Sequence, residues 1–209
     1  WKVIKAKRLF KERSQKGFPD EPLLAATQTK GVIPKSLYEN TTVTATKNFE
    51  TLKLVKKGDF VISLRSFQGG IEYAHYQGII SPAYTILEPS EFVVDRYYRY
   101  LLKSKGYISG FTVLVTGIGD GQNIDTAKFK DSYLPVPSFE EQHAIANFLD
   151  YKLTKIDRFI RKKKQLIKLL NEQKAGIINQ AVTKGLDTNA IMKPTGIEWL
   201  GEIPEHWIT

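Results

Sequence analysis

Cysteine is absent from this sequence, and histidine is rare. Without cysteine the chain forms neither a disulfide bond nor a thiolate metal site, and this absence fits a reducing cytoplasm. The histidines are His75, His143 and His206, and no two of them stand at the spacing of a metal-binding pair. We therefore expect a cytoplasmic protein without a metal site.

Long apolar runs are also missing. No stretch approaches the roughly 18 consecutive apolar residues that a membrane helix needs. The opening residues are not followed by the apolar core of a signal peptide. The apolar fraction is nevertheless 42%, which is ordinary for a globular protein. The composition predicts a protein that buries a core and has no membrane partner.

Catalytic motifs are missing as well, although three segments imitate them. Residues 115–121 look like a cofactor-binding glycine loop, and residues 81–84, Ser-Pro-Ala-Tyr, look like the motif with which adenine methyltransferases hold a flipped base. This interpretation fails because Ala83 replaces a proline, strands and helices do not alternate, and no acidic ribose partner follows the glycines. Pro19-Asp20 with residues 172–174 matches a nuclease motif only by chance. We expect no catalytic residues.

The positive charge is concentrated in two segments. The formal net charge is +9, with seven basic residues against one acid in residues 1–16 and ten against two in residues 151–185. Residues 17–150 carry −2 and residues 186–209 carry −3. We expect both basic segments to be helical. They indicate an acidic partner such as nucleic acid, or simply solvated helix faces.

Residues 1–137 are expected to form an α+β domain with a mainly antiparallel, twisted sheet. Short β-forming runs separated by turn residues lie at 41–46, 60–64, 79–80, 84–87 and 111–115. A helix is expected from Asp95 to Ser104, because tyrosines and leucines recur there at helical spacing. Strands and helices do not alternate regularly, which favours α+β over a parallel sheet.

Residues 138–185 are expected to form one coiled-coil helix of roughly 65 Å. Ser138 and Glu141 predict a capping box at its start, and Gly185 predicts its end. Eight of ten successive a and d heptad positions are apolar, whereas Lys163 and Lys174 interrupt the seam. The apolar seam positions are Leu149, Leu153, Ile156, Ile160, Ile167, Leu170, Ile177 and Ala181.

Residues 186–209 form a tail rich in apolar side chains. It contains Trp199 and Trp207, which a free tail would not expose to water, so we expect both to dock beside a recognition domain of the same or another copy.

Four segments, in this order, resemble the specificity subunits of type I restriction-modification enzymes. SLRSFQGGIEY at 63–73 and GIISPAY at 78–84 resemble the middle of a target-recognition domain. LPVP at 134–137 and EQHAIANFLD at 141–150 resemble the entry to the family's conserved helix, and NEQKAGIINQAVTKGL at 171–186 resembles its exit. GIEWLGEIPEHW at 196–207 resembles the lead-in to a further recognition domain.

The resemblance implies a non-catalytic subunit that reads one half of a bipartite target in double-stranded DNA. It also implies docking to methyltransferase subunits and, through them, to restriction subunits. The methyltransferase supplies S-adenosylmethionine, so no cofactor is expected on this chain. The family's usual subunit has two recognition domains and two conserved helices, whereas this chain has one of each. It is therefore a half subunit or a fragment, and the unpaired helix predicts a homodimer.

Candidate base-reading residues lie in polar loops between the expected strands, because side chains on loops reach base edges in the major groove. The candidates are Lys47, Asn48, Arg65, Ser66, Gln68, Gly69, His75, Tyr76, Gln77, Thr116, Gln122 and Asn123. Phe67, Gly69 and Gly70 are open to a scaffold role, and His75 is open to being an exposed bystander.

Two other functional classes stay open on sequence alone. One is a stand-alone DNA-binding regulator that dimerises through its coiled coil. The other is a protein-interaction coiled coil without a DNA role, which salt-dependent DNA binding would exclude.

Overall fold

The computed structural model describes residues 1–38, 48–64, 66–110, 115–116 and 123–208 of the 209-residue chain. By packing, the chain divides into residues 1–149 and residues 150–209, which we call the N-terminal unit and the C-terminal unit. In the described ranges, no helix is long and apolar enough to cross a membrane.

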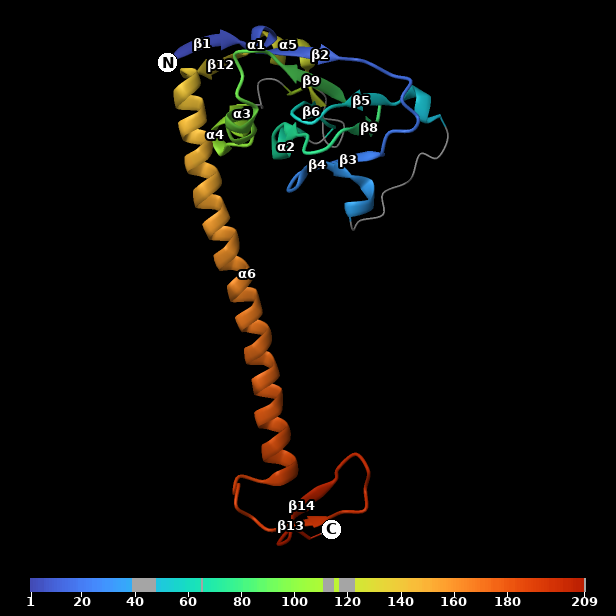
Figure 1. The fold of residues 1–209 in the computed structure, drawn as a ribbon, viewed down its shortest axis with the longest axis vertical. Helices are drawn as coiled ribbons and strands as arrows, with labels where there is room; N and C mark the ends of the chain where they lie inside the picture. Colours follow the sequence, from blue (N-terminus) through green and yellow to red (C-terminus); the bar gives the residue numbers. More distant parts are fainter. Residues whose placement is uncertain (39–47, 65, 111–114, 117–122, 209) are drawn as a thin grey trace. The chain divides into compact units, whose positions relative to one another are not determined.

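A four-stranded antiparallel sheet forms the centre of the N-terminal unit (Figure 1). In spatial order its strands are β2 (Phe10–Arg13), β9 (Thr85–Pro89), β6 (Phe60–Ile62) and β7 (Glu72–Tyr73). Successive side chains of a strand point to opposite faces. Accordingly, Phe60 and its partner Leu87 join one apolar core, and Val61 and its partner Ile86 join another. Both faces are buried, which explains the unbroken apolar run of β6.

Antiparallel two-stranded pairs accompany this sheet in the described part of the unit. They are β1 (Lys2–Lys5) with β12 (Tyr133–Val136), β3 (Leu24–Thr27) with β4 (Gly31–Pro34), β5 (Lys53–Val55) with β8 (Gly78–Ile80), and β10 (Val115–Thr116) with β11 (Asn123–Ile124). The α+β class and the strands expected near residues 60–64, 79–80 and 84–87 are confirmed. The run at 41–46, and residues 111–114 of the last expected strand, lie outside the described residues.

The basic stretch near the N-terminus is not the helix that we expected. β1 pairs with β12, a single helical turn α1 (Ala6–Leu9) follows, and β2 joins the central sheet. Ala6 and Leu9 are fully buried in the first core. The partners of both strands are distant in the sequence, and this long-range pairing outweighs the local amphipathic pattern.

Short helices complete the N-terminal unit. They are α2 (Ser66–Gly69), α3 (Asp95–Leu101), α4 (Lys105–Gly110), α5 (Thr126–Asp131) and the 3-10 turns Lys35–Leu37 and Phe49–Thr51. Helix α3 begins at Asp95, as predicted, and presents the fully buried Tyr98 to the core. The Tyr98 ring packs edge to face on Phe10, and its hydroxyl donates a hydrogen bond to the Pro135 carbonyl at 3.0 Å. Helix α3 is thereby joined to the strand that leads into the long helix.

Helix α6 (Phe139–Lys184) is continuous over 46 residues, as the sequence predicts, and is about 69 Å long at 1.5 Å per residue. The capping box is present: the Glu141 N–H donates to the Ser138 hydroxyl at 3.2 Å, and the Ser138 N–H donates to the Glu141 carboxylate at 3.1 Å. Gly185 follows the last helical residue with a left-handed φ of 80°, which glycine adopts without strain.

The first turns of α6 belong to the N-terminal unit and are anchored there by Gln142. This side chain is 1% exposed and accepts a hydrogen bond from the Val94 N–H at 2.9 Å. Its amide nitrogen donates to the carbonyls of Phe92 and Pro137 at 3.1 Å each. From residue 151 to residue 180, by contrast, every side chain is exposed.

The tail forms an antiparallel hairpin of β13 (Met192–Pro194) and β14 (Glu202–Pro204) in the C-terminal unit. Trp207 lies against the end of α6, because a Cβ atom on Gly185 would come within 3.4 Å of its ring. Lys193 Nζ donates to the Trp207 carbonyl at 2.6 Å. Trp207 thus packs within its own unit, whereas Trp199 is 81% exposed, and the docking of both beside a recognition domain stays a prediction.

Candidate nucleic-acid interface and helix seam

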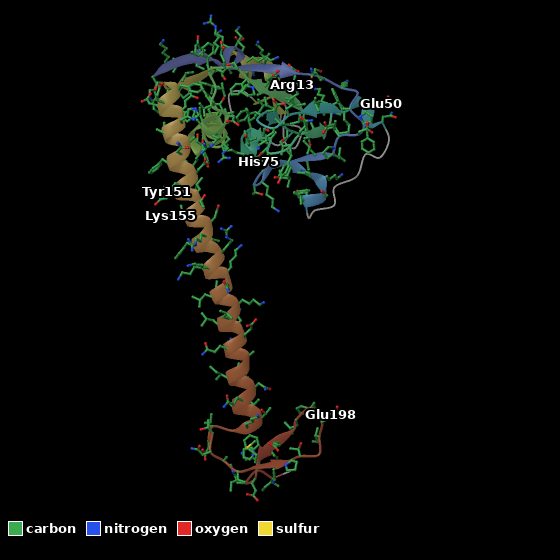
Figure 2. The ribbon with its side chains drawn as sticks, in the orientation of Figure 1. Arg13, Glu50, His75, Tyr151, Lys155 and Glu198 are labelled. Atoms are coloured by element: carbon green, nitrogen blue, oxygen red, sulfur yellow. The ribbon has the colours of Figure 1, made fainter. Side chains whose placement is uncertain are left out.

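The turn between β7 and β8 exposes His75, Tyr76 and Gln77, three of the predicted base-reading residues (Figure 2). The His75 ring packs edge to face on Tyr73 at 4.8 Å, and its backbone N–H donates to the Val32 carbonyl at 3.2 Å. The Gln77 amide donates to the Glu21 carboxylate. Contacts with neighbouring strands and loops therefore fix this polar turn, while its side chains are exposed to water.

The surroundings of His75 are electropositive. Partial burial, followed by the charges of Arg99 and Lys57, lowers the pKa of the His75 imidazole below its ordinary value. The positive potential that lowers this pKa would also attract a phosphate.

A second turn, which the sequence reasoning missed, lies beside the first. Gln28, Thr29 and Lys30 are exposed in the turn between β3 and β4. The Thr27 hydroxyl closes the turn by donating to the Gly31 carbonyl at 2.9 Å. Two apolar runs separated by a short polar segment that ends in glycine are a hairpin signal, and this signal could have found the turn.

Glycine at position 31 allows the two turns to approach each other. Its φ is +73°, and a Cβ atom there would come within 2.6 Å of the Tyr73 carbonyl and 3.1 Å of the His75 ring. Any larger residue would push the β3–β4 turn away from His75.

Lys103 joins the second turn to helix α2 and to β7. Its ammonium donates to the carbonyls of Gln28 at 2.9 Å and Gly69 at 2.7 Å, and to the carboxylate of Glu72. Glu72 is 1% exposed, and burial raises its pKa to about 7 despite the nearby ammonium. No sequence pattern marked Lys103, because its partners come from three separate segments.

The predicted DNA-binding residues of helix α2 differ in their exposure to solvent. Gln68 is exposed, while Gly69 lies so close to the second turn that a Cβ atom would come within 2.9 Å of Gln28 Cγ. Ser66 is fully buried, and its hydroxyl accepts the Ser63 N–H at 2.8 Å. We therefore interpret Ser66 and Gly69 as scaffold, which is the alternative that the sequence left open for Gly69 but not for Ser66.

Strands β10 and β11 place the backbone of Thr116 and Asn123 opposite each other, and β11 lies against α2. The surface formed by the turns at 75–77 and 28–30 and by Gln68 is called the polar strip below, and the backbone of β11 lies beside it at α2. It collects, from distant parts of the sequence, the residue types that read bases and phosphates.

The other predicted DNA-binding residues are not part of this strip as described. Lys47, Arg65 and Gln122 lie outside the described residues. Asn48 is exposed with a left-handed φ of 82°, and its carbonyl accepts hydrogen bonds from Thr51. No contact among the described residues joins Asn48 to the polar strip, so its DNA role stays a prediction.

The predicted seam of α6 is exposed along the C-terminal unit. The six large side chains from Leu153 to Ile177 are 40–59% exposed, and Leu149 and Ala181 at its two ends are half-buried. The six are Leu153, Ile156, Ile160, Ile167, Leu170 and Ile177. Phe159, Leu166 and Leu169 widen this apolar face and are also exposed.

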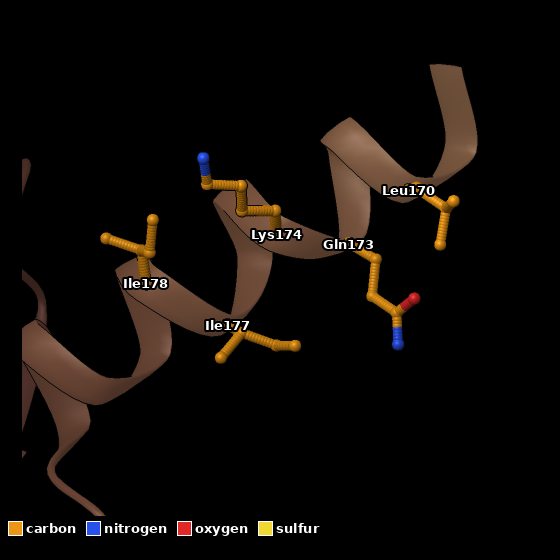
Figure 3. Close-up of a pocket in the computed structure, with 5 residues that line it drawn as sticks. All are labelled: Leu170, Gln173, Lys174, Ile177 and Ile178. Carbon is orange, nitrogen blue, oxygen red and sulfur yellow. The ribbon is translucent and has the colours of Figure 1, made fainter. Parts of the chain in front are cut away.

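One hollow on the seam has the outline that a coiled coil requires. It has a volume of about 400 Å³ and is lined by Leu170, Gln173, Lys174, Ile177 and Ile178 (Figure 3). The first four stand at positions i, i+3, i+4 and i+7, which form the hole that receives a knob from a facing helix. A hollow with this spacing is compatible with the packing of a second helix.

The described residues offer no metal chemistry at these surfaces. In the described ranges, no group of three or more His, Asp or Glu side chains is placed to hold a metal ion. What the geometry offers is hydrogen bonding from the polar strip and apolar packing from the seam.

Comparison with known proteins points to one group. Residues 1–169 match the profile of the type I restriction modification DNA specificity domain. The specificity subunit of the type I restriction enzyme MjaVIII from Methanocaldococcus jannaschii is 29% identical over 155 residues, which are 74% of this chain and 34% of that protein. The specificity subunit of StySPI from Salmonella potsdam is 29% identical over 102 residues, 49% of this chain and 22% of that protein. The chain spans about a third or less of these relatives' length.

Solved structures share the fold at low sequence identity. The HsdS subunit from Thermoanaerobacter tengcongensis superposes with a TM-score of 0.54 at 17% identity, over 89% of this chain and 45% of that one. A chain from a type I R-M system, studied for its complex assembly and conformational transition, gives 0.58 at 14% identity, over 94% of this chain and 52% of that one. At these identities the likeness concerns the fold.

Proposed function

The chain belongs to the family of type I restriction-modification specificity subunits, and on that premise we propose that it recognises one half of a bipartite DNA target. The observation that carries the proposal is the extent of the family match, which runs through residues 1–169 and so includes the whole N-terminal unit and much of α6. In this proposal the N-terminal unit reads DNA, α6 sets the distance to a second recognition domain, and the chain performs no chemistry itself.

We place base reading on the polar strip. Gln68 and Gln77 carry amides that suit adenine, while Lys30 suits phosphates, as does Lys57, whose charge acts on His75 from beside the strip. Arg65, Gln122 and Asn123 extend the set as predicted from sequence. Lys103 acts as a positioning residue, because it holds the carbonyls of Gln28 and Gly69 together.

The proposed protein partners are the methyltransferase subunits and, through them, the restriction subunits, all in the cytoplasm. The methyltransferase would supply S-adenosylmethionine and the base chemistry. The test is co-expression with a type I methyltransferase subunit from the same source, followed by mapping of methylated adenines. We expect methylation within one bipartite sequence motif that disappears when this chain is omitted. Methylation that is independent of the chain would contradict the proposal.

We further propose that two copies pair through α6 in antiparallel orientation. A second copy offers the same apolar seam, and each large side chain that it covers contributes about 1.5–3 kcal/mol. An antiparallel pair carries two identical recognition domains at opposite ends and would read an inverted repeat with a fixed gap. Light scattering at micromolar concentration should give twice the 23.8 kDa of one chain. A mass of one chain would show that another helix covers the seam.

A further inference from the structure

Trp199 is the most exposed tryptophan of the protein among the described residues, at 81%, and it stands on a hydrogen-bonded turn. The turn joins β13 to β14 and is closed by Thr195, whose hydroxyl donates to the Gly201 carbonyl at 2.7 Å and accepts the Ile197 N–H at 3.1 Å. The Leu200 N–H donates to the Ile197 carbonyl at 3.1 Å. An exposed indole held on a preorganised turn loses little conformational freedom on binding, which is typical of an anchor residue.

The turn is also acidic. Glu198 precedes Trp199, and Glu202 and Glu205 follow (Figure 2). Residues 186–209 carry four acids against Lys193. A complementary surface should therefore be both apolar and basic.

One face of the β1–β12 pair combines basic side chains with exposed apolar ones. It contains a hollow of about 370 Å³ lined by Val3, Ile4, Lys5, Lys7, Arg8 and Tyr133. Val3 is 65% exposed and Tyr133 63%, although both lie on paired strands. Asp131 accepts hydrogen bonds from Lys5 and Lys7, but residues 1–16 as a whole carry seven basic residues against one acid.

The proposed antiparallel pairing of α6 brings these two surfaces together. If the seam from Leu149 to Ala181 pairs with its copy about its own midpoint, Gly185 of one copy lies beside Ile145 of the other. Ile145 is in the first turns of α6, and these turns are tied to the β1 end of the pair by the Trp1 indole, which donates to Glu141 at 3.1 Å. The tail that follows Gly185 therefore starts next to the β1–β12 pair of the second copy.

We propose that Trp199 and its acidic neighbours dock into the hollow on the β1–β12 pair of a second copy of this chain. The inference rests on the proposed antiparallel pair and adds two equivalent contacts, one at each end. These contacts lock the orientation of the helices, because a parallel pair would place both tails at the same end, away from both hollows.

The first test uses cross-linking, which the absence of cysteine makes unambiguous. Full-length Glu202→Cys is mixed with full-length Lys2→Cys and treated with a short bismaleimide. We expect a two-chain product, and none when Glu202→Cys is mixed with Thr29→Cys on the polar strip. A parallel mixture of Lys163→Cys with Ile167→Cys reports on the seam itself. A seam product without a tail product would overturn this inference and leave the helix pair standing, whereas loss of both products would overturn both.

The second test measures dimer dissociation. Trp199→Ala should weaken the dimer by at least about tenfold, as expected for a buried anchor. Ile191→Ala is the matched control, because Ile191 is 74% exposed in the same unit but lies outside the turn and away from the end of α6. Arg8→Glu should weaken the dimer as well, and adding Glu198→Arg in the same chain should restore part of the loss. Equal dissociation constants for Trp199→Ala and Ile191→Ala would contradict the docking.

Discussion

The N-terminal unit and helix α6 use apolar residues in opposite ways. In the N-terminal unit, Phe60, Tyr98 and Phe129 are fully buried in one apolar core. The large apolar side chains of this core therefore have their packing partners within the unit. On α6, leucines and isoleucines recur as regularly as in a core, yet those between residues 151 and 180 are all exposed. The apolar side chains of the N-terminal unit are thus packed within the chain, whereas those of α6 are exposed, as expected for a surface that binds a partner.

The largest expected effect is on the free energy of unfolding of the N-terminal unit, and it tests whether contacts within this unit stabilise it. Arg13 is 7% exposed (Figure 2), and it donates to the buried Asp59 at 2.9 Å and 3.3 Å and lies 2.9 Å from Glu88. Arg13→Ala leaves the Asp59 charge without its partner and should lower the free energy of unfolding by about 3–5 kcal/mol. Chemical denaturation measures it. A loss below about 1 kcal/mol would mean that Asp59 is solvated or neutral in the folded state.

The next largest effect should be on the stability of the proposed dimer and not on the folding of the single chain. Ile167 is 58% exposed in the single chain, so Ile167→Asp should leave the melting of the N-terminal unit unchanged. In the proposed pair it removes about 1.5–3 kcal/mol of apolar burial from each copy. Sedimentation of the dimer at falling concentration measures this change, and Gln165→Asp on the opposite side of the helix is the control. An unchanged dimer would show that Ile167 is not in the seam.

Much of this contrast could be predicted from sequence, because α6 follows local rules. Ser138, Glu141 and Gly185 are capping residues within a turn of the helix ends, and the heptad positions recur along a single segment. The α+β class and the strand around Val61 were also predictable, from the unbroken apolar run.

The N-terminal strands and the polar strip were not predictable in the same way. The sequence predicts a helix at β1, because the alternation of polar and apolar residues there is short. Its partner strand β12 is more than a hundred residues away in the sequence. Lys103 meets Gln28 and Gly69 only after the chain folds. A single sequence contains no local signal for such contacts.

A smaller effect distinguishes base recognition on the polar strip from the electrostatic attraction of phosphates by Lys57 beside it. Gln68→Ala should lose about 1–3 kcal/mol of binding at one base pair and relax the preference there. Lys57→Ala should weaken binding evenly across sequences and reduce the salt slope by about one. Fluorescence anisotropy with target and scrambled duplexes distinguishes the two. If Gln68→Ala lowered affinity equally for both duplexes, α2 would only contact the backbone.

The smallest expected effect concerns His75 and pH. Its pKa is lowered in the free protein by burial and by Arg99 and Lys57, and a nearby phosphate would favour the charged imidazolium and raise it. His75 therefore takes up a proton when the protein binds DNA. The affinity for DNA should increase several-fold when the pH falls from about 8 to about 6 at constant salt. His75→Gln should remove the difference. The same pH dependence in His75→Gln would assign the proton to another group.

The most direct measurement of the whole account is selection of DNA by the full chain from a random duplex library. Two recognition domains held by an antiparallel helix pair predict an inverted repeat of identical half-sites with one fixed gap. The same selection with Ile167→Asp should yield single half-sites. Enrichment of no sequence, or of one undivided asymmetric site by the unchanged chain, would contradict the account.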